Sequence, residues 1–377
     1  MILALDTELS EGTSIARWQE LSGLIRTMIA SLTSRSHSIY FSRPQVEMIL
    51  AHCDLSRADE RVIRGTYLSR FNDFHEWHRR ALCRLTFSDN VDAPEISTWQ
   101  GYQIIAPAND YEDWNLSRPI SLIGEHLGND VMWYIRIATV CNSVFGNSGL
   151  GVRSIPFHGG GGGVHVYFPL LKNNHESAFC LIDSDRDGCW DAIGKNPLRI
   201  LQAAKQTGLI SDHCRGYSTL RPMFGLKISS VRNVGNTVPP ELVQRYYAFI
   251  EKTPAQLRAF GETFPNFPQL EDDEWQVWLG LNFENLPSSA AFSASFHGRI
   301  SPEVEARVSA CLAAGNPPRI PKSITGRILA WEQQSKDSSV LDDAVRRSLE
   351  VTPYRSAMFA LLSDYASMAS AFDRLVA

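Results

Sequence analysis

Residues 178–188 read AFCLIDSDRDG, an apolar run followed at once by three acids at alternate positions. The first five residues are typical of a buried strand, so Asp183, Asp185 and Asp187 are expected directly beyond its end. Carboxylates this close together repel one another unless they share a cation. Mg²⁺ and Mn²⁺ prefer oxygen ligands, and open α/β sheets bind ligands at the carboxyl ends of their strands. The stretch therefore predicts a site for Mg²⁺ or Mn²⁺.

A second strand and a helix are predicted upstream of this stretch. Residues 120–125 read ISLIGE, a short apolar run that carries Glu125 at its end. Residues 129–140 have the pattern of a helix, for which Asn129 or Asp130 is the expected N-cap. The same edge of a sheet would thus receive a second acid.

A glycine run lies between these two predicted units. Residues 154–158 read SIPFH, five glycines follow at 159–163, and the apolar run 164–171 is expected to form a second helix. The predicted order is a strand ending in Glu, a helix, a strand with a glycine run, a helix, and a strand ending in Asp-Ser-Asp.

This order resembles a Toprim domain, which is shared by topoisomerases, bacterial primases and nucleases of the overcoming-lysogenization-defect group and their phage-defence relatives. The resemblance covers about residues 118–235 of 377 and rests on Glu125, the glycine run and the Asp183-Ser184-Asp185 motif. It implies an α/β fold with a central, mostly parallel, Rossmann-like sheet. It also implies that Glu125, Asp183 and Asp185 bind metal and perform phosphoryl chemistry.

The chain departs from the Toprim pattern near the first acid. Family members usually have Glu-Gly and an acid four residues after the glutamate. Here Gly124 precedes Glu125, and Asp130 follows it by five residues. Asp130 is therefore a secondary candidate.

A second departure concerns the later metal ligands. Defence-type members often carry an Arg-Glu-x-Glu-Asn sequence, whereas residues 231–236 read VRNVGN and keep only Arg232 and Asn236. These two are secondary candidates, and Asp187 or Glu241 is a possible replacement ligand. Residues 231–236 therefore offer no acid for a second metal ion.

The glycine run is a candidate phosphate-binding turn. Because glycine has no Cβ, the backbone N–H groups of such a turn can approach a phosphate closely. Gly159, Gly160, Gly161 and Gly162 are the residues expected to make this contact. The alternative is a flexible linker, which glycine runs often form.

The acidic stretch also has two other readings. Asp183, Asp185, Asp187 and Gly188 fit the start of a calcium loop of the EF-hand type, but the twelfth position is Gly194 where a Glu is needed. A strand followed by Asp-x-Asp also begins phosphatases of the haloacid-dehalogenase kind, and the later Ser/Thr and Lys of that fold are not found in the required order.

A basic segment at residues 57–84 is the candidate nucleic-acid contact. It holds seven arginines against four acids, and Arg57, Arg61 and Arg64 fall on one face of a helix. Arg61 and Arg64 are therefore expected to follow a phosphate backbone. The alternative is that these arginines pair with neighbouring acids on a solvated helix.

Composition bounds the class of protein. Of the 377 residues, 44% are apolar and 20% are charged, as in a globular protein of two or three domains. Seven cysteines without a Cys-x-x-Cys pair argue against a zinc ribbon and a disulfide framework, and favour a reducing cytoplasm. Residues 1–12 do not read as a secretory signal, and no membrane span is predicted. A net charge of −5 indicates that any contact with nucleic acid is local.

Three regions are predicted: a mainly helical N-terminal domain at 1–117, the Toprim-like domain at 118–236, and a mainly helical C-terminal region at 237–377. The function expected is that of a metal-dependent endonuclease acting on DNA or RNA in antiviral defence. No phosphate-loop motif occurs, so ATP dependence would need a partner protein, and an oligomer is possible. The alternative is a degenerate Toprim protein that binds nucleic acid or scaffolds a complex.

Overall fold

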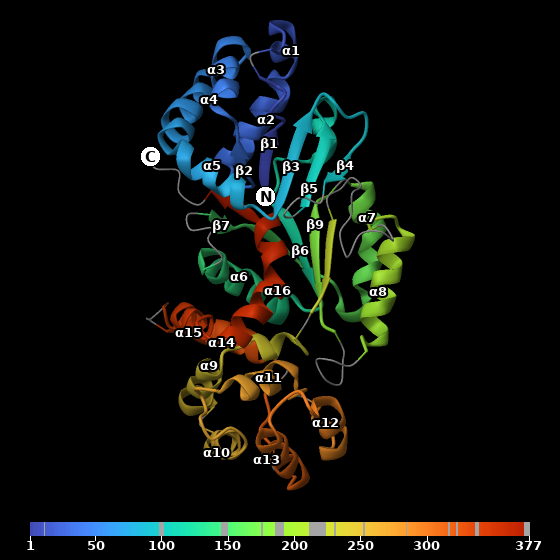
Figure 1. Ribbon diagram of the computed structural model, residues 1–377, viewed down its shortest axis with the longest axis vertical. Coiled ribbons are helices and arrows are strands. Elements are labelled where there is room, and N and C mark those ends of the chain that lie inside the picture. Colours follow the sequence, from blue (N-terminus) through green and yellow to red (C-terminus); the bar gives the residue numbers. More distant parts are fainter. Residues whose placement is uncertain are drawn as a thin grey trace.

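The computed structural model places a five-stranded sheet above a four-stranded sheet, with a group of helices at the lower end of the molecule (Figure 1). It describes every residue except 11, 98–101, 145–149, 175, 185–191, 211–223, 230, 252, 284, 316, 322, 336–338 and 373–377. The molecule is elongated, and the sheet that carries the candidate acids lies between the other two parts (Figure 1).

The upper sheet has the strand order β2-β1-β3-β5-β4, in which only β4 runs antiparallel. Its strands are β1 (Ile2–Leu5), β2 (Ser38–Tyr40), β3 (Cys83–Ser88), β4 (Glu95–Ser97) and β5 (Tyr102–Pro107). The helices of this part are α1 (Ile15–Glu20), α2 (Ser22–Thr33), α3 (Arg43–His52), α4 (Arg57–Arg61), η1 (Val62–Tyr67), η2 (Leu68–Arg70), α5 (Phe71–Arg80) and η3 (Ala108–Trp114).

The region at 1–117 contains the predicted helices and, in addition, a five-stranded sheet that was not predicted. Most of its strands were not predicted because parallel strands buried on both faces lack the alternation of apolar and polar residues that marks a half-exposed strand. Every residue of β1 is at most 3% exposed, so its four apolar residues carry no such signal.

The middle sheet is entirely parallel and has the order β10-β9-β6-β8. Its strands are β6 (Ile120–Gly124), β8 (Ser154–His158), β9 (Ala178–Ile182) and β10 (Phe224–Ile228). The predicted strands that lead to Glu125, to the glycine run and to Asp183 are thus confirmed. The fold is α/β with parallel sheets, as expected.

Helices cover both faces of the middle sheet (Figure 1). One face carries α7 (Phe168–Asn173) and α8 (Lys195–Gln206), whose apolar residues form a buried cluster with β9 and β10. The other face carries α6 (Met132–Val144) and the long C-terminal helix α16 (Thr352–Met368). Two short turns, η4 (Leu127–Val131) and η5 (Gly161–Tyr167), connect the strand ends to these helices.

The C-terminal region is mainly helical, as predicted, and its last part returns to the centre of the molecule. The elements are η6 (Val234–Thr237), α9 (Pro240–Arg245), η7 (Tyr246–Glu251), α10 (Pro254–Thr263), α11 (Asp272–Gly280), α12 (Ser289–Phe296), α13 (Pro302–Ala313), α14 (Ile324–Gln334), α15 (Val340–Ser348) and β11 (Ser370–Phe372). Helix α16 packs against α6, and β11 pairs with β7 (Leu150–Val152). The apolar core is continuous through these regions.

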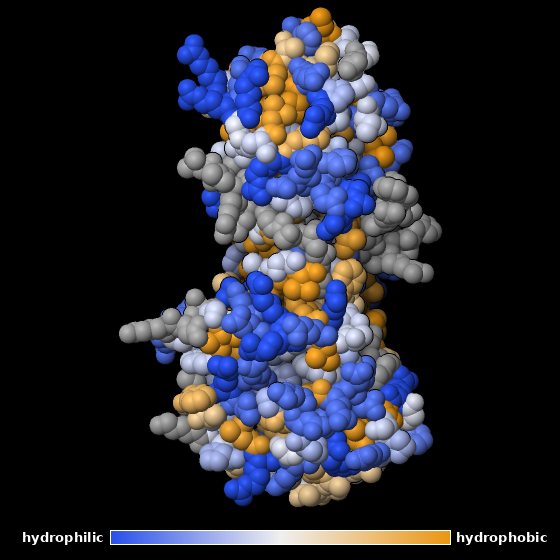
Figure 2. Space-filling model, turned by 60° about the vertical axis from the view of Figure 1, so that its left-hand side comes forward, coloured by the Kyte–Doolittle hydropathy of each residue, from blue (hydrophilic) through white to orange (hydrophobic). Residues whose placement is uncertain are grey.

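The surface drawn in Figure 2 mixes hydrophilic residues with separate groups of hydrophobic ones. No helix in the described part of the chain has the length and apolar character needed to cross a membrane. Cys53, Cys83, Cys141, Cys180 and Cys311 are free thiols. The remaining two cysteines lie outside the described residues.

Candidate functional site

A cavity of 260 Å³ lies at the carboxyl ends of β6 and β9. Glu125 directly follows β6 and Asp183 directly follows β9, and both residues line this cavity. The two strands are hydrogen-bonded neighbours in parallel register, with Ser121 opposite Ala178, so their ends meet at one edge of the sheet. The structure therefore brings together two acids that are far apart in the sequence.

A third acid, Asp130, lines the same cavity and is 6% exposed. It is not the N-cap of its helix, and neither is Asn129, because the helical turn begins three residues earlier than predicted, with His126 at the N-cap. The carboxylate of Asp130 accepts a hydrogen bond from the backbone N–H of His126 at 2.9 Å. This bond fixes the backbone directly after Glu125.

Tyr134 lies among these acids and was missed by the sequence analysis. Its hydroxyl donates a long hydrogen bond of 3.5 Å to Asp183 Oδ1, and its ring is buried. Burial raises the pKa of Tyr134 well above its ordinary value, and the charges of Asp183, Asp130 and Glu125 raise that pKa further. The spacing of four residues between Asp130 and Tyr134 on one helix face was the available signal.

Ser184, the middle residue of the Asp-Ser-Asp motif, connects the acids to another segment. It is fully buried, and its hydroxyl donates to the carbonyl oxygens of Val231 at 3.3 Å and Arg232 at 3.4 Å. Asp185 and Asp187 lie outside the described residues, so their predicted roles stay predictions.

The glycine run supports the site backbone through its own amides. Gly159 N–H donates to the carbonyl of Gly124 at 2.8 Å, Gly161 N–H donates to the carbonyl of Glu125 at 3.0 Å, and Gly160 N–H donates to His158 Nδ1 at 2.8 Å. Gly160 and Gly161 have positive φ angles of 71° and 63°, which glycine adopts without strain. These three amides already have acceptors, so their predicted contact with phosphate has no support in this geometry.

Arg61 and Arg64 are not brought to the cavity. They lie on α4 and η1 in the upper part of the molecule, whereas β6 ends toward the lower helices (Figure 1). Both are exposed, and Arg64 Nε is 3.8 Å from the carboxylate of Glu60, four residues earlier. This contact fits the alternative of a solvated helix face.

The two candidates in residues 231–236 have different roles. Arg232 lines the cavity. Asn236 is 1% exposed, and its side-chain amide donates to the carbonyl oxygens of Trp278 and Leu281, so it holds two segments together. Glu241 is wrong as a replacement ligand. It forms ion pairs with Arg245 and Arg347 and lines a different cavity, of 510 Å³.

Four side-chain amides also line the 260 Å³ cavity. Asn129 and Asn233 lie beside the segments already described, and Asn282 and Asn285 come from the loop after α11. No feature of the sequence near residues 282–285 distinguishes them from ordinary loop asparagines. Their role depends on how the C-terminal region packs.

Oxygen atoms that could bind a divalent cation come from the acids of this cavity. Among the described residues, no group of three or more His, Cys, Asp or Glu side chains is arranged so that it could hold a metal ion. Glu125, Asp130 and Asp183 nevertheless line the same cavity, and carboxylate oxygens are the ligands that hard cations prefer. Two further acids of the motif lie beyond the described part.

Comparison of the chain with family models, with curated proteins and with solved structures finds no match. The functional assignment therefore depends on the cavity and on the order of the elements around it.

Proposed function

We propose that this chain is a metal-dependent nuclease of the Toprim kind, which hydrolyses phosphodiester bonds of DNA or RNA with Mg²⁺ or Mn²⁺. The observation that carries the proposal is the meeting of Glu125 and Asp183 in one cavity at the ends of two neighbouring parallel strands. Carboxylates in this position are a common way to hold a hard cation.

The order of the elements supports the same proposal. Glu125 follows β6 and leads into α6, the glycine run follows β8 and leads into α7, and Asp183 follows β9. This is the order on which the resemblance to Toprim domains rests. The antiviral setting, a cytoplasmic location and an ATPase partner are proposed from that resemblance and from the absence of a phosphate-loop motif in the sequence.

In the proposed reaction the oxygen of a water molecule forms a bond to phosphorus and loses a proton to solvent. The bond from phosphorus to the leaving sugar oxygen breaks, and that oxygen takes up a proton from solvent. Glu125 and Asp183 would hold a divalent cation, which lowers the pKa of bound water and neutralises charge on the phosphate. Asp130 fixes the backbone at His126, beside Glu125. Tyr134 stays protonated near neutral pH, because its pKa is raised, and its hydroxyl holds Asp183 in place.

A cleavage assay with plasmid DNA and with labelled RNA tests the proposal. We expect cleavage with Mg²⁺ or Mn²⁺, none with EDTA, and rates about 100-fold lower in Asp183→Ala and Glu125→Gln, the scale seen when one group that stabilises transition-state charge is removed. Glu176→Gln is the matched control, because Glu176 lies just before the other end of β9. Cleavage that survives EDTA, or that is unchanged in Asp183→Ala, contradicts the proposal.

A second candidate function is binding of nucleic acid without cleavage. The observation that favours it is that residues 231–236 contribute Arg232 to the cavity but no acid, so one expected set of metal ligands is missing. Stable binding of a labelled oligonucleotide, together with no cleavage under either cation, would support this candidate.

A further inference from the structure

One wall of the cavity comes from segments beyond the middle sheet. Arg232 lies between β10 and η6, and Asn282 and Asn285 lie between α11 and α12. These side chains offer N–H donors and one positive charge, whereas Glu125 and Asp183 offer only acceptors. The cavity thus combines carboxylate groups with hydrogen-bond donors.

The side chain of Arg232 has a buried donor. Its Nε atom is inaccessible to solvent and has no hydrogen-bond partner among the described residues. A buried N–H without an acceptor destabilises a fold, and such groups are rare unless a water, an ion or a ligand supplies the acceptor. Arg232 as a whole is partly exposed and lines the cavity, so an anion bound there would contact this residue.

The backbone of Arg232 is fixed relative to the acids. Its N–H donates to the carbonyl of Leu279 at 3.0 Å, and its carbonyl accepts from the hydroxyl of Ser184, next to Asp183. On the same wall, the side-chain oxygen of Asn282 accepts from the backbone N–H of Asn285 at 3.0 Å. The position of this wall is therefore set before any ligand binds.

We propose that Arg232 binds a phosphate group of a nucleic-acid backbone, with Asn282 and Asn285 beside it. A guanidinium matches two phosphate oxygens with two parallel N–H donors, which a single ammonium cannot do. The segment after β10 and the loop after α11 then supply the anion-binding half of the site. The inference rests on the proposed function for the identity of the ligand as nucleic acid, but it requires no cleavage.

The experiment measures binding of a fluorescent oligonucleotide with phosphorothioate linkages, single-stranded and double-stranded, in EDTA over a range of salt concentrations. We expect Arg232→Gln to weaken binding about tenfold or more and to reduce the slope of log K against log salt by about 0.7 to 0.9, the value for one phosphate contact. Arg232→Lys should have an affinity between those of the wild type and Arg232→Gln, because it keeps the charge and loses the paired donors. Arg258→Gln removes the same charge from an exposed position on α10 and should change neither quantity.

The outcomes separate this inference from the proposed function. Loss of binding in Arg232→Gln supports the inference even where the wild type cleaves nothing, a result that would overturn the nuclease proposal alone. Unchanged affinity and salt slope in Arg232→Gln overturn the inference, and so does a wild type that binds neither probe. A thermal melt is the fold control: since Nε has no partner in the described part of the chain, Arg232→Gln should not lower the melting temperature. A lower melting temperature with unchanged binding means a structural role and overturns the inference.

Discussion

The two walls of the cavity differ in charge and in how they are held. The acidic wall stands on the ends of β6 and β9, which are fixed by the hydrogen bonds of a parallel sheet. The other wall, with Arg232 and Asn282, is called the donor wall here. It is held by hydrogen bonds from side chains to backbone and by the packing of the C-terminal helices. Because different contacts hold the two walls, a substitution can disturb one wall without disturbing the other. A change in the C-terminal helices should disturb the donor wall and leave the acids in place.

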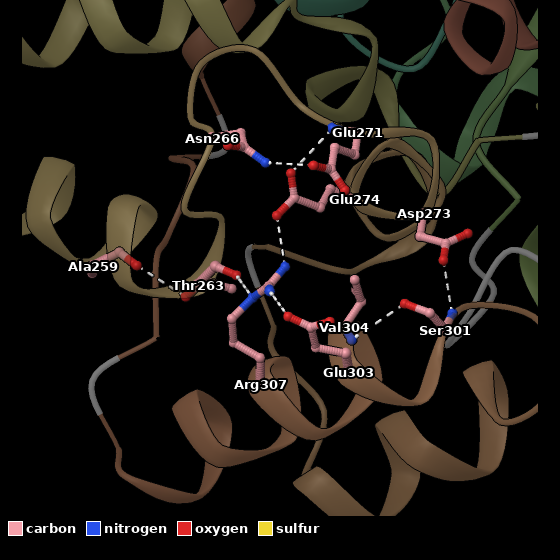
Figure 3. Close-up of polar contacts among 10 residues, drawn as sticks. All are labelled: Ala259, Thr263, Asn266, Glu271, Asp273, Glu274, Ser301, Glu303, Val304 and Arg307. Carbon is pink, nitrogen blue, oxygen red and sulfur yellow. Dashed lines mark hydrogen bonds and ion pairs between the residues drawn. The ribbon is translucent and has the colours of Figure 1, made fainter.

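A polar network holds the helix that precedes Asn282 (Figure 3). Arg307 on α13 donates from Nε to the carbonyl of Thr263 on α10 at 3.0 Å, and from its terminal nitrogen to Glu274 on α11 at 2.6 Å. Glu274 is 1% exposed, whereas Glu303 at 3.8 Å from Arg307 lies in solvent. Arg307 on α13 is therefore connected to α10 through a backbone carbonyl and to α11 through a buried carboxylate.

Of the variants considered, Arg307→Met should lower stability most. We expect it to lower the free energy of unfolding by about 3–5 kcal/mol, because it leaves the carboxylate of Glu274 buried without its cation. Denaturation in urea measures the change. Arg258→Met, from the exposed side of α10, is the control and should cost less than about 0.5 kcal/mol.

The pH dependence of the unfolding free energy of Arg307→Met tests whether the unpaired carboxylate of Glu274 is the cause of the loss. Burial already raises the pKa of Glu274, and removing Arg307 should raise that pKa further. A carboxyl whose folded pKa lies above its unfolded value binds protons more tightly in the fold, so acidification stabilises the variant relative to wild type. We expect the loss of unfolding free energy in Arg307→Met, relative to wild type, to be smaller at pH 5 than at pH 7. It should also be smaller in the double variant with Glu274→Gln. An equal loss at both pH values and in the double variant would contradict this account.

The acidic wall could be predicted from the sequence because its signals are local. An apolar run followed by Asp183 or Glu125 marks a strand end within a few residues, and parallel neighbours bring such ends together. Arg232 was a candidate from the sequence, but the rest of the donor wall could not be predicted, because it depends on contacts such as the one from Asn236 to Leu281, 45 residues later. Most strands of the upper sheet were not predicted, for another reason. Its buried strands are too short and too uniformly apolar to be told from helix segments.

The glycine run supports the acidic wall, and substitutions within it test that support. A Cβ on Gly159 would lie 2.6 Å from the carbonyl oxygen of Gly124 and would also meet Val164, and the backbone oxygen cannot move without displacing Glu125. We expect Gly159→Ala to cost about 1–3 kcal/mol of unfolding free energy and to slow cleavage. The position of Gly163 has nothing within 4 Å of an added Cβ, so Gly163→Ala is the matched control and should be neutral or slightly stabilising. Equal stability and cleavage in the two variants would mean that the run is only a linker.

The smallest expected effect at neutral pH belongs to Tyr134→Phe, because a single buried hydrogen bond contributes about 0.5–1.5 kcal/mol. The effect grows in alkali: the pKa of Tyr134 is raised by burial and by the nearby acids, so the unfolded chain loses this proton first and stability falls above pH 10. Removing the hydroxyl should reduce that fall by about 1.4 kcal/mol per pH unit.

Tyr354→Phe separates the two parts of this prediction. Burial also raises the pKa of Tyr354 well above its ordinary value, but its hydroxyl donates to the carbonyl of Thr237 at 2.8 Å, not to an acid of the cavity. Both variants should therefore flatten the alkaline loss of stability alike, as measured by urea denaturation between pH 9 and pH 11. Only Tyr134→Phe should change the Mg²⁺ concentration needed for half-maximal cleavage, because only Tyr134 contacts Asp183. If both variants leave that concentration unchanged, Tyr134 belongs to the apolar core under the acidic wall and takes no part in the site.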